Sequence, residues 1–162
     1  ETLNDCAKRF YQGNDPFVSL YRKGFIDTCT VLSERRAIVE AGGFDTSLKN
    51  AQDFEMWLAV LAPTNRTFVV FEDVLSRYHI VQGSIMSHTA RRLRCCMDIA
   101  HRYANALKGR TPSPLKDVLY RVLAIHYESV TAYRNQGRYW AVLGVLSGLP
   151  CRLAGASACP SQ

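Results

Sequence analysis

The chain has 162 residues, of which 48% are hydrophobic and 21% charged, so it can bury a core and lacks the composition of a disordered protein. This length suits one domain or part of a larger one. The net charge of +6 suits an anionic partner, but the arginines are spread along the predicted helices, which argues against a nucleic-acid partner. No apolar run reaches the roughly 18 residues that cross a bilayer, and no signal peptide is evident.

Six cysteines occur without CxxC spacing and without paired histidines. This pattern fits neither a zinc site nor a disulfide framework. Reduced thiols in a cytosolic protein are therefore expected. The cysteines are Cys6, Cys29, Cys95, Cys96, Cys151 and Cys159.

Residues 1–90 are predicted to mix helices and strands. Strands are expected where β-branched and aromatic residues alternate or form short apolar blocks, at residues 25–32, 67–71 and 74–80. Helices are expected at residues 1–11 and at 34–41, the second with Ser33 as its N-cap.

The most informative stretch joins a glycine pair to an acidic helix start. Gly42 and Gly43 are predicted to end one helix in a left-handed cap, with Phe44 folded back onto it. Asp53 then begins the next helix, either as a cap or as a general base held beside an open cleft. Apolar residues at helical spacing predict the buried stripe of this helix, namely Phe54, Trp57, Leu58 and Leu61.

Only helices are predicted beyond residue 90. They cover residues 91–108, 115–136 and 139–149, with stops at Gly109, Gly137 and Pro150. The expected architecture is therefore an α/β layer over residues 1–90 followed by a helical extension over residues 91–162.

Several motifs resemble, in order, the second half of the catalytic domain of family 2 glycosyltransferases, inverting enzymes with the GT-A fold. The motifs are Thr30 to Arg36, the loop Gly42-Gly43-Phe44-Asp45, the acidic helix start Gln52 to Leu58, and the ending Val74 to Tyr78 with Gly83-Ser84-Ile85. The resemblance implies a partial Rossmann-like layer of the nucleotide-diphospho-sugar transferase type.

The resemblance also implies a reaction, the transfer of a sugar from a nucleotide-sugar donor to an acceptor hydroxyl. The acceptor would be a glycan or a lipid-linked molecule, as in the synthesis of surface polysaccharide, lipopolysaccharide or glycolipid. Asp53 would be the general base, and the acceptor site would be shaped by Gly43, Phe44, Asp45 and Gln52. Mn²⁺ or Mg²⁺ is expected on the diphosphate, with ligands mostly outside this chain. The implied location is the cytoplasm, with a peripheral contact to the inner face of the plasma membrane as one option.

The sequence departs from the family pattern at several points. Gln52 replaces the usual glutamate beside Asp53, and Val81 stands where the family often has histidine. No DxD motif is present, and Asp15, the nearest acidic candidate, lies in a predicted turn. The chain is thus expected to be a C-terminal fragment without turnover of its own, and no residue in it is assigned as a metal ligand.

Two further interpretations stay open. Residues 127–141 resemble one helix-turn-helix of a tetratricopeptide array, which would suit a non-catalytic protein-interaction module. Such arrays, however, need about three repeats to bury a core. The basic segment of Arg91, Arg92 and Arg94 would be attracted to anionic lipid.

Overall fold

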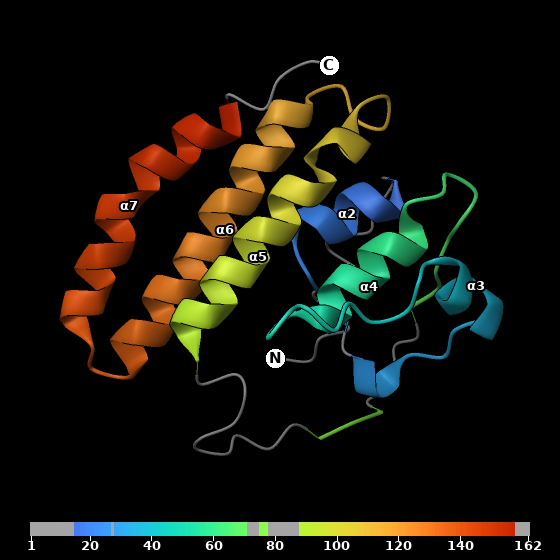
Figure 1. The fold of residues 1–162 in the computed structure, drawn as a ribbon, viewed down its shortest axis with the longest axis horizontal. Coiled ribbons are helices and arrows are strands. Elements are labelled where there is room, and N and C mark those ends of the chain that lie inside the picture. The colour runs from blue at the N-terminus through green and yellow to red at the C-terminus, as the bar shows by residue number, and fades with distance from the viewer. Residues whose placement is uncertain (1–14, 27, 71–74, 78–87, 158–162) are drawn as a thin grey trace.

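The computed structural model describes residues 15–26, 28–70, 75–77 and 88–157, and this part of the chain is helical (Figure 1). The helix predicted over residues 1–11 lies outside it. The α-helices are α2 (Pro16–Arg22), α3 (Arg35–Glu40), α4 (Gln52–Leu61), α5 (Thr89–Tyr103), α6 (Pro114–Asn135) and α7 (Tyr139–Ser157), and two 3₁₀ turns are η1 (Thr28–Thr30) and η3 (Ala104–Leu107).

The predicted α/β layer is wrong, because the described residues contain no strand and no sheet. Residues 25–26 and 31–32 are irregular on either side of η1, and residues 67–70 and 75–77 have no regular secondary structure. A β-rich pattern becomes a strand only where a neighbour completes its backbone hydrogen bonds. Here the two segments meet through side chains instead, because the ring centroids of Phe25 and Phe68 lie 5.7 Å apart.

Helix α6 is central, since α2, α5 and α7 all pack against it (Figure 1). Helix α4 packs on α2, and α3 packs on α4. One apolar core runs through these helices, and its largest fully buried side chains include Phe17, Tyr21, Met56, Leu58 and Ile99. The core therefore combines residues from both sides of residue 90.

Arg110 ties three segments together at one end of this core. Its guanidinium lies 3.0 Å from both carboxylate oxygens of Asp15 and 4.8 Å above the Phe17 ring, and it donates to the carbonyl oxygen of Ala62 after α4. Asp15 also caps α2, because its Oδ1 accepts from the amides of Phe17 at 2.8 Å and Val18 at 3.2 Å. Asp15 thus has a structural role in this fold.

The helical half follows its sequence pattern closely, with one exception. Gly109 and Gly137 have positive φ values of 76° and 69°, as expected after a helix end. Helix α7, however, does not stop at Pro150 but continues to Ser157. Proline removes the bond to the carbonyl four residues earlier. That residue is Leu146, which lies on the exposed side of α7.

Candidate functional site

The glycine pair forms the predicted left-handed cap of α3. Gly42 and Gly43 have φ values of 88° and 71°, and the Gly43 amide donates to the Ile38 carbonyl at 3.0 Å. The predicted N-cap is off by one residue: Glu34 occupies that position and makes no side-chain capping bond. The cap ends α3 and leads into the loop that connects it to α4.

The loop after the cap, which we call the 44–51 loop, runs from Phe44 to Ala51 and is held to the start of α4. Leu48 is its buried anchor, and the Gln52 side-chain amide donates to the Leu48 carbonyl at 2.9 Å. Phe44 was expected to fold back onto the helix, and it is 52% exposed. Leu48 fills the core instead and leaves the Phe44 ring on the surface.

Asp53 lies in the first turn of α4 with an exposed side chain. Its Oδ1 accepts from the Phe54 amide at 2.8 Å, and its Oδ2 accepts from the Thr28 hydroxyl at 3.4 Å. Thr28 in turn accepts from the buried Trp57 indole at 3.2 Å. Ala51, not Asp53, is the N-cap residue, but the bond to Phe54 still satisfies one of the free amides of the first turn.

The predicted stripe of α4 explains why Asp53 faces outward. Trp57, Leu58 and Leu61 are buried, and Phe54 is half-buried beneath the Arg121 guanidinium, 4.3 Å from its ring centroid. With this face fixed on the core, Asp53 lies on the solvent side of the first turn.

Arg102 of α5 clasps the loop to α4 in a cluster that we call the Arg102 clasp: Asp45, Glu55, Arg102 and Tyr103. Arg102 Nη1 lies 2.9 Å from Asp45 Oδ2 and 3.0 Å from Glu55 Oε1, and the Tyr103 hydroxyl donates to the same Glu55 oxygen at 2.8 Å. Glu55 is only 6% exposed, so these two donors compensate for the burial of its charge.

The clasp fixes protonation states as well as positions. Hydrogen bonds from the Ser47 hydroxyl and from Arg102 lower the pKa of Asp45 to about 2, and the Ser47 amide adds to the effect. Burial, with the hydrogen bond to Glu55, raises the pKa of Tyr103. Asp45 is therefore a paired anion at neutral pH and is poorly suited to accept a proton.

These contacts place the five predicted site residues relative to one another. Gly43, Phe44 and Asp45 lie on the loop, while Gln52 and Asp53 start α4. The loop joins the helix through Leu48 and through the Arg102 clasp. Residues two apart on a helix point about 200° apart, which directs Glu55 to the clasp and Asp53 to Thr28.

Sequence reasoning missed Thr28, Glu55 and Arg102 as residues of this site. Thr28 lies in the strand predicted at residues 25–32, where the structure has η1 instead. No sequence pattern linked Thr28 to Asp53, which lies 25 residues further along the chain. No spacing pointed to Arg102, which lies 57 residues from Asp45.

The described residues contain no group of three or more histidine, cysteine, aspartate or glutamate side chains that could hold a metal ion. No disulfide joins the described cysteines, which are Cys29, Cys95, Cys96 and Cys151. Cys6 and Cys159 lie outside the described residues.

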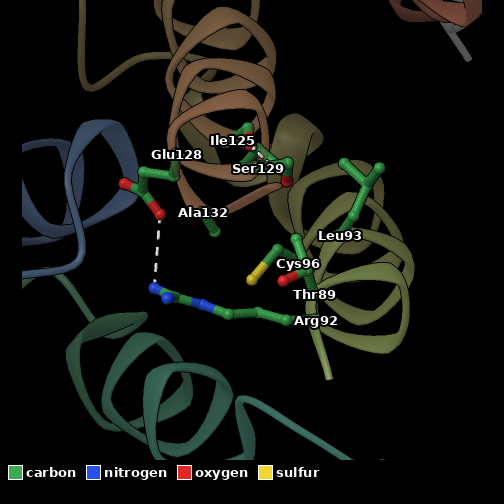
Figure 2. A pocket seen from close by; sticks show the side chains of 8 residues that line it. All are labelled: Thr89, Arg92, Leu93, Cys96, Ile125, Glu128, Ser129 and Ala132. Carbon is green, nitrogen blue, oxygen red and sulfur yellow. Dashed lines mark hydrogen bonds and ion pairs between the residues drawn. The ribbon is translucent and has the colours of Figure 1, made fainter. Parts of the chain in front are cut away.

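A small cavity lies between α5 and α6 (Figure 2). Its volume of about 20 Å³ has room for about one water molecule. Burial raises the pKa of the Cys96 thiol in its wall, so this sulfur stays protonated and is not an activated nucleophile. Arg92 at the cavity rim pairs with Glu128 at 3.2 Å and is thus engaged within the fold.

No protein-family model, curated protein or solved structure matches the chain. None of the helices that the structure describes is long and apolar enough to cross a membrane.

Proposed function

We propose that this chain supplies the acceptor side of an inverting glycosyltransferase in which Asp53 is the general base. The proposal combines the motif resemblance with one observation. Of the three carboxylates at positions 45, 53 and 55, Asp45 and Glu55 are bound to Arg102, whereas Asp53 is exposed and makes no ion pair with any described residue.

The proposed step needs a base on one side of the sugar and a leaving nucleotide on the other. Asp53 takes the proton of the acceptor hydroxyl, whose oxygen attacks the anomeric carbon. The bond from that carbon to the nucleotide diphosphate breaks, its electron pair leaves with the diphosphate, and the configuration inverts. Thr28 would hold Asp53 in the orientation that this proton transfer requires.

The acceptor is proposed to lie over the 44–51 loop. The exposed Phe44 ring offers an apolar surface to one face of a sugar or to a lipid-linked acceptor. Gly43 leaves the backbone beside it uncovered, since no atom lies within 4 Å of a Cβ built there. Gln52 uses its amide nitrogen on Leu48, which leaves the amide oxygen as a hydrogen-bond acceptor near the base.

The test compares Asp53→Asn with wild type, both expressed from the complete reading frame, in an assay of nucleotide-diphosphate release. Donor sugar nucleotides are screened with Mn²⁺ or Mg²⁺. We expect turnover to fall by about 100-fold or more, because the amide cannot accept the proton. Asp98→Asn, which changes an exposed aspartate of α5, is the matched control and should leave turnover unchanged. Equal turnover of Asp53→Asn and wild type would leave Asp53 with only a structural role in the first turn of α4.

A further inference from the structure

Helix α7 has two apolar faces, of which the fold covers one. Val145 is buried on α6, and Ala141, Val142 and Leu149 are partly buried beside it. Trp140 is 87% exposed and Leu143 56% exposed on the outer side. Figure 1 shows α7 at the edge of the molecule, with α6 between it and α5. A stable helix that exposes this much apolar surface indicates an interaction site.

The outer face is free of charge over its length. From Tyr139 to Ala154, each exposed position of α7 carries an uncharged side chain or is glycine. The large members, Tyr139, Trp140, Leu143 and Leu146, follow helical spacing and form one stripe, which we call the outer stripe of α7.

The charges around the outer stripe are of one sign. Arg134 is exposed in the last turn of α6, and the exposed Arg138 directly precedes Tyr139 and Trp140, with its guanidinium 5.1 Å from the Tyr133 ring centroid. The last acidic residue of the sequence is Glu128, so residues 129–162 carry arginines and no carboxylate side chain. A cationic, aromatic end on an uncharged apolar stripe is the pattern of a helix that lies in a membrane interface.

We infer that the outer stripe of α7 docks on an anionic lipid surface, with Arg134 and Arg138 at the headgroups. The apolar side chains would enter the headgroup–acyl boundary, and each arginine adds attraction to anionic lipid. A second copy fits less well, since residues 129–162 offer no carboxylate side chain with which these arginines could pair. This surface is separate from Arg91 to Arg94, and the inference does not depend on glycosyl transfer.

The two tryptophans of the chain allow a direct measurement. Trp57 is 6% exposed and Trp140 is 87% exposed, so a blue shift of tryptophan emission on adding lipid reports on Trp140. The protein is titrated with vesicles of phosphatidylcholine alone and of phosphatidylcholine mixed with phosphatidylglycerol, and flotation is measured in parallel. We expect flotation and a blue shift with the mixed vesicles, weakened by salt.

Variants separate the two parts of the surface. Leu143→Glu with Leu146→Glu should lower the vesicle partition coefficient by about 100-fold, and Arg134→Gln with Arg138→Gln by about tenfold or more on anionic vesicles only. Leu32→Glu changes a fully exposed leucine elsewhere and is the matched control, expected to bind as wild type. Circular dichroism confirms that each variant is folded.

Three results would overturn the inference. They are absence of flotation with anionic vesicles, binding that survives the double glutamate variant, and a concentration-dependent blue shift without lipid that accompanies a dimer in sedimentation. The last result would assign the stripe to a second copy of the chain.

Discussion

Helices α4 and α7 lie at opposite sides of the bundle and are held in different ways (Figure 1). Helix α4 combines a buried apolar stripe with polar bonds to η1 and α5, through Thr28 and Arg102. Helix α7 packs on α6 mainly through apolar side chains. Directional polar bonds fix the position of a carboxylate, as a reacting group requires. Non-directional apolar contact leaves a second face free for docking.

The largest effect on stability is expected at the α4 side, from Arg102→Met. This change leaves the buried Glu55 with Tyr103 as its remaining donor within the clasp and frees Asp45. We expect the free energy of unfolding to fall by about 2 kcal/mol, measured by urea denaturation. Glu55→Gln in the Arg102→Met background should recover part of the loss, because it removes the uncompensated charge. An Arg102→Met chain as stable as wild type would show that the clasp adds nothing to the fold.

A matched pair of changes tests the two faces of α7. Val145→Ala removes two methyl groups from the contact with α6 and should cost about 1.5 kcal/mol of unfolding free energy. Leu143→Ala trims an exposed side chain and should stay within about 0.5 kcal/mol of wild type. Similar losses in both variants would mean that the outer stripe is covered in solution. Urea denaturation at two protein concentrations measures both and separates self-association from folding.

The smallest expected effect is a pH dependence at the α6–α7 contact. His126 Nδ1 lies 2.7 Å from the Val122 carbonyl, so it donates there, and Nε2 accepts from Arg152 Nη1 at 3.3 Å. Burial, with the nearby Arg152 charge, lowers the pKa of His126 below 6.5. The unfolded chain then binds the proton more readily, so stability is full above 6.5 and declines as pH falls through the lowered pKa.

The thermal midpoint should therefore drop between about pH 7 and about pH 5, in part because of His126. His126→Gln does not titrate and should lose that part of the slope. A slope unchanged by the substitution would place the pH dependence elsewhere.

Local sequence patterns predicted helices reliably, because a helix makes its own backbone hydrogen bonds and needs a neighbour only at its apolar face. The long amphipathic patterns gave α5 and α6, and the glycines gave the caps at 42–43, 109 and 137, because positive φ is a local requirement that glycine meets without strain. The same local reasoning failed at residues 25–32 and 67–70, where a strand needs a partner that the pattern does not specify.

The same distinction between local pattern and tertiary contact applies to the candidate site. The sequence by itself placed Asp53 at the start of α4 and buried Trp57, since both follow from helical spacing. Only the tertiary structure brought Thr28 to Asp53 and Arg102 to Asp45 and Glu55, because the chain's path decides which distant residues meet. It likewise left the outer stripe of α7 uncovered, because an apolar pattern shows that a helix has a buried face but not how many neighbours the fold supplies.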